Sequence, residues 1–245
     1  NELFFSVPGL LCARRKDSGS HVVVYADGTE SVRIPDEVTV IESYAFGGAR
    51  HLRELFLNTR IHYVGMRGLS VDCVIEHIHI DLVEPIEGHE YFDLYFPDAA
   101  RTAHEIQLAF NLSGSVDPRM IFKHYDSAIV NMHEFDKKSR DKEFDLYGQA
   151  KLALDRLSDP VLMTSTNRIM VTQVITDNLE SICEACARHD DREAIDDLLE
   201  LGLLNKDNLL GVIESVGKLQ DAAMTGYLLE VKRRFFRESA IDFDL

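Results

Sequence analysis

Apolar residues recur at a fixed spacing in the N-terminal part of the 245-residue chain. The segment that starts at Ile34 aligns without a gap with the segment that starts at Leu57, and the match continues to Ile80. Such recurrence is typical of a repeat architecture, in which each unit buries its apolar face only by stacking on its neighbours. The aligned pairs are Ile34 with Leu57, Val38 with Ile61, Ile41 with Val64, Ala45 with Gly68, Phe46 with Leu69, Leu52 with Ile75, Leu55 with Ile78 and Leu57 with Ile80.

Each repeat contains alternating apolar residues that predict a short strand. The strands expected around Leu55 and Ile78 would lie side by side, with their apolar side chains facing inward. Ahead of them, residues 21–25 and 30–34 flank an Asp-Gly pair, which is a strong hairpin signal. We therefore predict a hairpin that caps the first repeat. Residues 92–97 look like one more strand, which we interpret as a shortened closing repeat.

These residues resemble the BspA-like leucine-rich repeat family, whose units read approximately I-P-x-x-V-x-x-I-x-x-x-A-F followed by L-x-x-I-x-I-P. The first copy fits this pattern closely, whereas the second copy has Asn58 in place of proline and Gly68-Leu69 in place of Ala-Phe. The resemblance covers about residues 20–100. It implies a short right-handed solenoid used for protein or surface recognition, and it specifies no partner.

A second repeat, with a longer spacing, lies near the C-terminus. Asn178-Leu179 matches Asn208-Leu209, and both copies contain Leu-Leu-Glu, at 198–200 and at 228–230. Each copy predicts two helices and a tight turn. It resembles a degenerate ankyrin repeat without the Thr-Pro-Leu-His signature, and an unclassified pair of helical hairpins is the alternative.

The two repeats together predict an α+β fold class. We expect a leucine-rich-repeat β-solenoid at the N-terminus, followed by an all-α, ankyrin-like C-terminal region. The predicted domains are 1–98 for the leucine-rich repeats with their capping hairpin, 99–160 for a helical connector and 161–245 for the helical repeats.

The composition narrows the classes of partner. The net charge is -16, from 42 acidic and 26 basic residues, so the chain would repel a nucleic-acid backbone. No apolar run reaches the roughly 18 to 20 residues that a membrane span requires. Four cysteines do not make a disulfide scaffold in a chain of this length, and reduced thiols favour the cytoplasm. A leader removed from the chain would instead place the protein at the cell surface or outside the cell.

Two clusters contain residue types that bind metals. Cys183-x-x-Cys186, followed by His189, has no second pair of ligands, and both cysteines align with apolar residues of the next repeat. We interpret them as core residues. His77-x-His79 places two imidazoles on one strand face, and Asp81 or His89 would be the third ligand.

A solvated strand face is more common than a metal site, so we expect no metal and no cofactor. The chain also has no zinc-protease motif, nucleophile elbow, phosphate-binding loop or dinucleotide-binding glycine pattern. We therefore expect no enzymatic activity. The basic cluster Lys232–Arg234, with Phe235, Phe236 and Arg237 after it, is expected to form the polar end of the last helix.

If the strands stack at the repeat spacing, their outward residues form rows. The expected rows contain Arg33, Phe56 and His79, continued by Tyr95, with Glu54 and His77 to one side. Aromatic and arginine side chains are enriched at protein interfaces. We therefore predict a non-enzymatic scaffold that binds a protein or peptide. Self-assembly into a homo-oligomer is the alternative, and a metal-binding protein that uses the histidine and cysteine clusters is less favoured.

Overall fold

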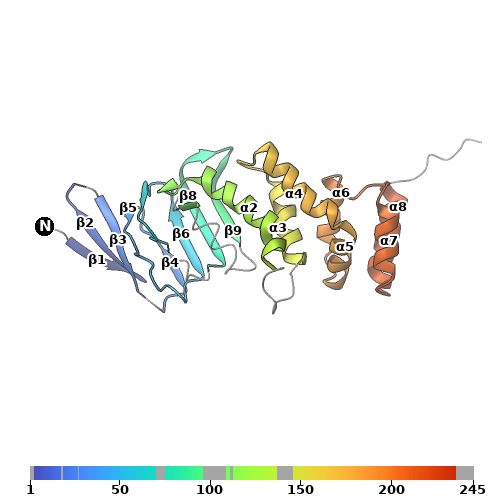
Figure 1. The fold of residues 1–245 in the computed structure, drawn as a ribbon, viewed down its shortest axis with the longest axis horizontal. Helices are drawn as coiled ribbons and strands as arrows, with labels where there is room; N and C mark the ends of the chain where they lie inside the picture. The colour runs from blue at the N-terminus through green and yellow to red at the C-terminus, as the bar shows by residue number, and fades with distance from the viewer. Residues whose placement is uncertain are drawn as a thin grey trace, which may run out of the picture. The chain divides into compact units, whose positions relative to one another are not determined.

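The computed structural model describes residues 3–17, 19–26, 28–69, 75–95, 109–110, 113–136 and 146–235. Contacts between residues divide the chain into two compact units. The first unit is Asn1–Ser139 with Val161–Asn167, and the second is Arg140–Pro160 with Arg168–Leu245. Strands occur in the first unit and most helices in the second (Figure 1).

The first unit contains two mixed sheets. The first sheet has the order β1-β2-β3-β5-β7 and the second sheet has the order β4-β6-β8-β9. The strands of the first sheet are β1 (Leu3–Val7), β2 (Leu10–Arg15), β3 (Gly19–Tyr25), β5 (Val38–Ile41) and β7 (Tyr63–Val64). The strands of the second sheet are β4 (Ser31–Arg33), β6 (Glu54–Asn58), β8 (His77–Ile86) and β9 (His89–Tyr95).

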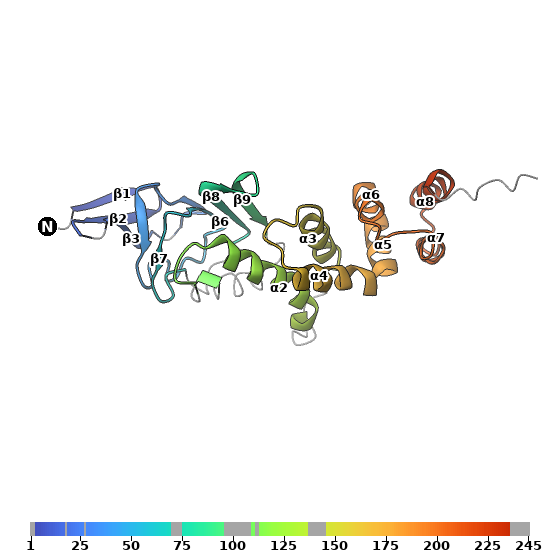
Figure 2. The same ribbon diagram turned by 90° about the horizontal axis from the view of Figure 1, so that it is seen from above.

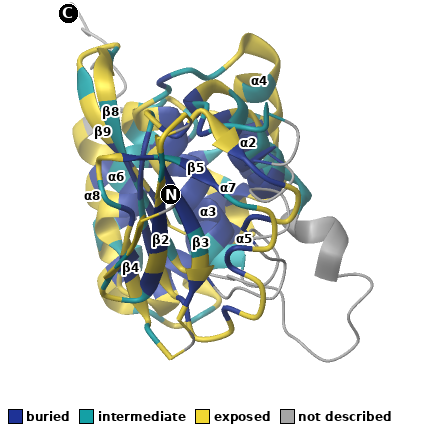
Figure 3. Cartoon of the chain, turned by 90° about the vertical axis from the view of Figure 1, so that its left-hand side faces the viewer, coloured by how far each residue is buried: buried dark blue, intermediate teal, exposed yellow. Residues whose placement is uncertain are grey.

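The parallel strands β4, β6 and β8 of the second sheet, and β5 and β7 of the first, pair at the spacing of the sequence repeat, whereas the parallel pair β3 and β5 does not. In the second sheet, β4, β6 and β8 are parallel, and Val32 lies opposite Leu55, which lies opposite Ile78. In the first sheet, β5 and β7 are parallel, and Val40 lies opposite Tyr63. Side chains alternate between the two faces of a strand, so the apolar members of each row are buried together while their neighbours face outward. Figure 3 colours the strands by burial, and both buried and exposed residues occur in them.

The turns between these strands lie close to one another. Gly65 donates its backbone N–H to Ile41 O at 2.8 Å, and Phe46 N donates to Gly68 O at 2.9 Å. A Cβ atom on Gly65 would lie 2.4 Å from the backbone nitrogen of Ser43. Successive turns can therefore approach this closely only because residue 65 has no side chain.

Helix α2 (Pro118–Asp136) packs against the second sheet (Figures 1 and 2). Phe122 makes an edge-to-face contact with Phe92 of β9, with ring centroids 4.8 Å apart. The hydroxyl of Tyr125 donates to Tyr95 O at 3.0 Å. The helix begins just after Asp117, whose side chain accepts a hydrogen bond from Arg119 N, so Pro118 occupies its first turn.

The predicted fold class is wrong. The described residues form two mixed sheets with nine strands, together with seven helices, and not a leucine-rich-repeat β-solenoid followed by an ankyrin-like all-α region. Antiparallel pairing accounts for the difference, because β1, β2 and β3 form an antiparallel meander and β9 is antiparallel to β8. The chain combines α and β structure, and in the described residues helices α2 to α8 follow the last strand.

Two local predictions also fail. Residues 21–25 and 31–33 do not form a hairpin, because β3 and β4 belong to different sheets and β3 pairs with β2 and β5. Asp27 of that predicted hairpin lies outside the described residues. The strand β9 is not a closing repeat, because a turn at Glu87 and Gly88, both with positive φ, reverses the chain after β8.

The second unit contains helices in pairs that recur at the spacing of the second sequence repeat. The helices of this part of the chain are α3 (Leu146–Ser158), α4 (Ser165–Asp177), α5 (Leu179–Arg188), α6 (Arg192–Glu200), α7 (Leu209–Gly217) and α8 (Ala222–Phe235). Asp191 Oδ1 accepts a hydrogen bond from Ala194 N, and Asp221 Oδ1 accepts one from Met224 N at the equivalent position of the next pair. These carboxylates therefore cap the N-termini of α6 and α8, respectively. Leu198 and Leu228 occupy equivalent buried positions in the two pairs.

None of the helices in the described ranges is long and apolar enough to cross a membrane. Residues 99–108 of the predicted helical connector lie outside the described residues, as do Cys73, Phe236 and Arg237.

The close approach at Gly65 predicts a large effect of a small substitution. Gly65→Ala should lower the free energy of unfolding by about 1–3 kcal/mol, because the added Cβ meets backbone atoms that cannot rotate away. Chemical denaturation followed by circular dichroism measures the change. Gly226→Ala is the control, since its added Cβ meets open space in α8 and should stabilise the helix by up to about 1 kcal/mol. A Gly65→Ala protein as stable as the wild type would contradict this packing.

Candidate functional site

The outward face of the second sheet carries a cluster of aromatic, histidine and charged side chains. We call this cluster the histidine face, and its members come from all four strands of the sheet. They are Arg33, Phe56, His77, His79, Asp81, Tyr91, Asp93 and Tyr95. The opposite face of the same strands is buried in the core of the first unit.

Ring contacts hold the two histidines in place. His77 stacks on Tyr95, with centroids 4.5 Å apart and planes 6° apart, and His79 stacks on Tyr91 at 5.1 Å. Phe56 lies against both imidazoles, at 5.8 Å from His77 and 5.4 Å from His79. Each imidazole is therefore fixed by at least two neighbouring rings.

Hydrogen bonds link the same side chains through their charged groups. Asp93 Oδ1 lies 2.7 Å from His77 Nε2 and 2.8 Å from His79 Nδ1. The second ring nitrogen of His79, Nε2, lies 2.9 Å from Asp81 Oδ1. Ionised carboxylates only accept hydrogen bonds, so these nitrogens are the donors. Arg33 extends this series of hydrogen bonds by donating to Asp81 Oδ2 at 2.9 Å.

The environment of Asp93 favours its charged form. Partial burial acts to raise the pKa of Asp93, but the hydrogen bonds from His79 and His77 and their positive charge outweigh it, so the pKa lies below its ordinary value. Arg33 also places its guanidinium 4.4 Å from the centroid of Phe56, which is within cation–π range. The histidine face is a connected network and not a set of independent surface residues.

The structure brings most of the predicted binding residues together. Arg33 lies opposite Phe56, and Phe56 lies opposite His79, as the repeat spacing requires. Glu54 lies opposite His77 at the margin of the face. Tyr95 does not continue the central row, because β9 runs antiparallel and Tyr95 lies opposite His77.

Sequence reasoning missed Tyr91 and Asp93 as members of this face. The antiparallel register places Asp93 directly opposite His79 and Tyr91 opposite Asp81. The alternation of Tyr91, Asp93 and Tyr95 with the buried Phe92 and Leu94 was the signal that could have identified them.

The second predicted cluster has the properties of a helical core. Cys183 and Cys186 are buried, and burial raises the pKa of both thiols, for Cys186 to about 12. The ring of His189 stacks on Tyr147 at 4.1 Å. Thiols protonated at neutral pH are poor nucleophiles and poor metal ligands. Within the described ranges, the group of three side chains with metal-ligand geometry is His77, His79 and Asp93.

Asp191, which follows this cluster, is held by three donors. Tyr147 donates its hydroxyl to Asp191 Oδ2 at 2.7 Å, Lys151 Nζ lies 3.3 Å from the same oxygen, and Ala194 N bonds to Oδ1. Burial acts to raise the pKa of Asp191, but these hydrogen bonds and the charge of Lys151 outweigh it, and the pKa falls below its ordinary value. Asp191 therefore joins α3 to α6 through its charged form.

The basic cluster near the C-terminus is partly paired. Arg233 donates to both carboxylate oxygens of Glu230, at 2.8 and 2.7 Å, one turn earlier on the exposed surface of α8. Exposed pairs of this kind stabilise a helix only slightly.

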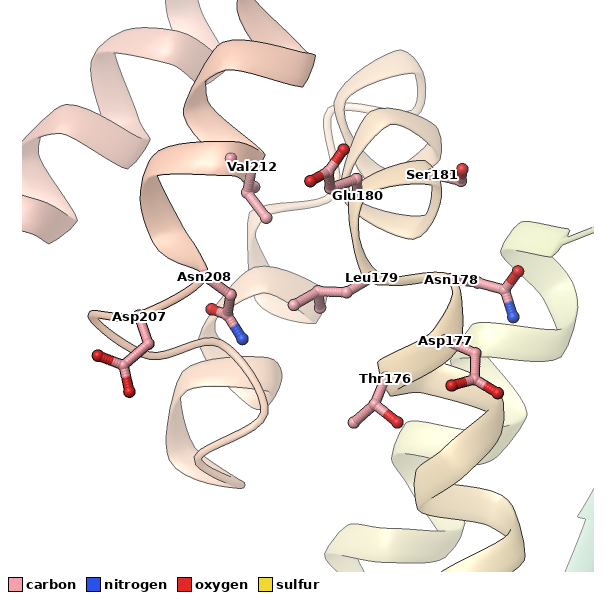
Figure 4. Close-up of a pocket in the computed structure, with 10 residues that line it drawn as sticks. Thr176, Asp177, Asn178, Leu179, Glu180, Ser181, Asp207, Asn208 and Val212 are labelled. Carbon is pink, nitrogen blue, oxygen red and sulfur yellow. The ribbon is translucent and has the colours of Figure 1, made fainter.

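A pocket of about 550 Å³ lies where α4 ends and where α5 and α7 begin (Figure 4). The first turns of α5 and α7 would attract an anion, but Asp177, Glu180 and Asp207 line the same pocket and oppose one. The amides of Asn178 and Asn208 donate to backbone carbonyls at the adjoining turns. We assign these polar groups to the helix ends and not to a ligand.

Comparison with family models, with curated proteins and with solved structures finds no match. The functional argument therefore depends on the geometry of the histidine face.

The low pKa of Asp191 predicts a pH-dependent contribution to stability. Asp191→Asn should lower the free energy of unfolding by about 1–2 kcal/mol at pH 7, where its charge strengthens three hydrogen bonds. The stabilisation is fully present above the unfolded-state pKa of about 3.9 and is lost as the pH falls through the lower folded-state pKa. Denaturation at pH 7 and at about pH 2.5 measures the difference.

The control is Asp190→Asn, because Asp190 is 76% exposed and lies 3.6 Å from Arg192. This variant should match the wild type at both pH values. An Asp191→Asn deficit of equal size at both pH values would contradict the electrostatic origin.

Proposed function

We propose that the protein is a non-enzymatic binding protein that uses the histidine face to recognise a segment of a protein partner. The observation that carries the proposal is a cluster of exposed tyrosine and arginine side chains over a buried sheet core. Tyr91, Tyr95 and Arg33 are each more than half exposed. Tyrosine and arginine are the residues that most often dominate the binding energy of protein interfaces.

The fixed positions of these side chains support the proposal. Stacking of the tyrosines on His77 and His79, and the bond from Arg33 to Asp81, order the side chains before a partner arrives. Ordering of flexible side chains is a cost of association, so a preordered face binds with a smaller entropic loss.

A second candidate is association between copies of this chain. Strand β1 is at the edge of the first sheet, and its Leu3 and Phe4 are 66% and 58% exposed. An apolar edge strand can pair with another strand. Self-association predicts that the average molecular mass in solution rises with protein concentration, whereas the leading proposal predicts capture of a different protein.

The test is quantitative capture from a lysate of the native cell, repeated with purified partner once it is identified. Replacing Tyr91 and Tyr95 together by alanine should weaken the complex at least about 30-fold, the factor expected when a 2 kcal/mol hot spot is lost. Tyr63→Ala is the matched control, since Tyr63 is a similarly exposed tyrosine in the first sheet. Equal affinity of the double variant, the control and the wild type would overturn the proposed surface.

A further inference from the structure

We propose that His77, His79 and Asp93 form a binding site for a zinc ion, with a fourth coordination position that faces solvent. One ligand atom from each of the three side chains lies within 4.8 Å of the other two. The two histidines come from β8 and the aspartate from β9, and His79 and Asp93 lie directly opposite one another. This inference goes beyond the proposed partner binding and does not depend on it.

The spacing of the ligand atoms fits a small metal ion. A zinc ion bound to nitrogen and oxygen at about 2.0–2.1 Å in tetrahedral geometry keeps its ligand atoms about 3.3–3.4 Å apart. In the structure, His77 Nε2 and His79 Nδ1 lie 2.7 and 2.8 Å from Asp93 Oδ1. Each nitrogen–oxygen pair needs to separate by about 0.6 Å, and the partly exposed Asp93 carboxylate can make this movement. The two histidine nitrogens lie within 4.8 Å of one another and need to reach the same spacing.

In the metal-free site, protons occupy the space between the two histidines and Asp93 where the ion would bind. The two imidazole nitrogens that face Asp93 donate protons to it when no metal is bound. Imidazole coordinates a metal through a nitrogen that carries no proton, so each of these nitrogens gives up the proton that it donates to Asp93 when it binds zinc. The carboxylate then contributes its charge to the ion.

A second set of contacts has the arrangement found around metal-binding histidines. Such histidines usually donate their other ring N–H to a carboxylate, which fixes the ring orientation. The other nitrogen of His79, Nε2, lies 2.9 Å from Asp81 Oδ1, and Arg33 in turn bonds to Asp81 Oδ2. Stacking on Tyr91 and Tyr95 fixes the planes of the two imidazoles. The ligands are therefore oriented before the ion binds.

The ligand types select among metals. Two imidazole nitrogens and one carboxylate oxygen suit zinc and exclude calcium and magnesium, which prefer oxygen ligands alone. Three protein ligands with one open position are the pattern of zinc sites that bind water or an external ligand. The side chains of His77, His79 and Asp93 are 16%, 15% and 29% exposed, so solvent reaches all three ligands and can supply the fourth.

Isothermal titration of the metal-free full chain with zinc chloride tests the site. We expect one zinc ion per chain, and we expect Asp93→Asn or His77→Gln to weaken binding at least about 10-fold. Asp81→Asn changes no direct ligand, yet it should weaken binding by about 10- to 100-fold because it releases the ring of His79. His62→Gln, which removes an exposed histidine outside the cluster, should leave the affinity unchanged.

Substitution with Co²⁺ gives a second measurement that needs no variant. Tetrahedral coordination by nitrogen and oxygen produces intense visible absorption, whereas hexahydrated Co²⁺ absorbs weakly. Wild-type affinity in both Asp93→Asn and His77→Gln would overturn the proposal. So would a Co²⁺ spectrum of the wild type that matches the free ion.

Discussion

The parallel register of β4, β6 and β8 is the constraint on which the histidine face depends. Two rows of apolar side chains determine it, because residues one repeat apart lie opposite each other and are buried together. The rows are Val32, Leu55 and Ile78, and Ile34, Leu57 and Ile80. A slip of one residue would turn these side chains outward and move Phe56 and His79 into the core. The hydrophobic core thus determines which polar and aromatic residues meet on the surface.

The antiparallel strand β9 then contributes the carboxylate and the tyrosines that contact the two histidines. The parallel strands alone would supply Arg33, Phe56, the two histidines and Asp81. The chain reversal at Glu87 and Gly88 adds Asp93 between the histidines and a tyrosine beside each imidazole. A single carboxylate oxygen then joins His77 to His79.

The repeat spacing could be predicted from the sequence because every aligned position obeys the same burial requirement. The spacing therefore predicts Arg33, Phe56 and His79 on one outward row, and the structure pairs them in that order. The direction of β9 could not be predicted from periodicity, since alternating residues look the same in parallel and antiparallel strands. The hairpin expected at Gly28 failed for a different reason, because pairing of β3 with β2 and β5 outweighed the local turn signal. The predicted fold class was wrong because strand pairing depends on contacts between residues far apart in the sequence, which a local pattern does not specify.

A disulfide engineered across β4 and β6 tests the register most directly. Ser31 and Glu54 are exposed opposite partners, and adjacent strands lie about 4.8 Å apart, so Ser31→Cys with Glu54→Cys should oxidise readily to an intrachain disulfide. The pair Ser31→Cys with Phe56→Cys is two residues out of register, about 8 Å apart, and should stay reduced. Mass spectrometry of the cross-linked peptides distinguishes the two. Preferential cross-linking of residue 31 to residue 56 would contradict the register and the histidine face built on it.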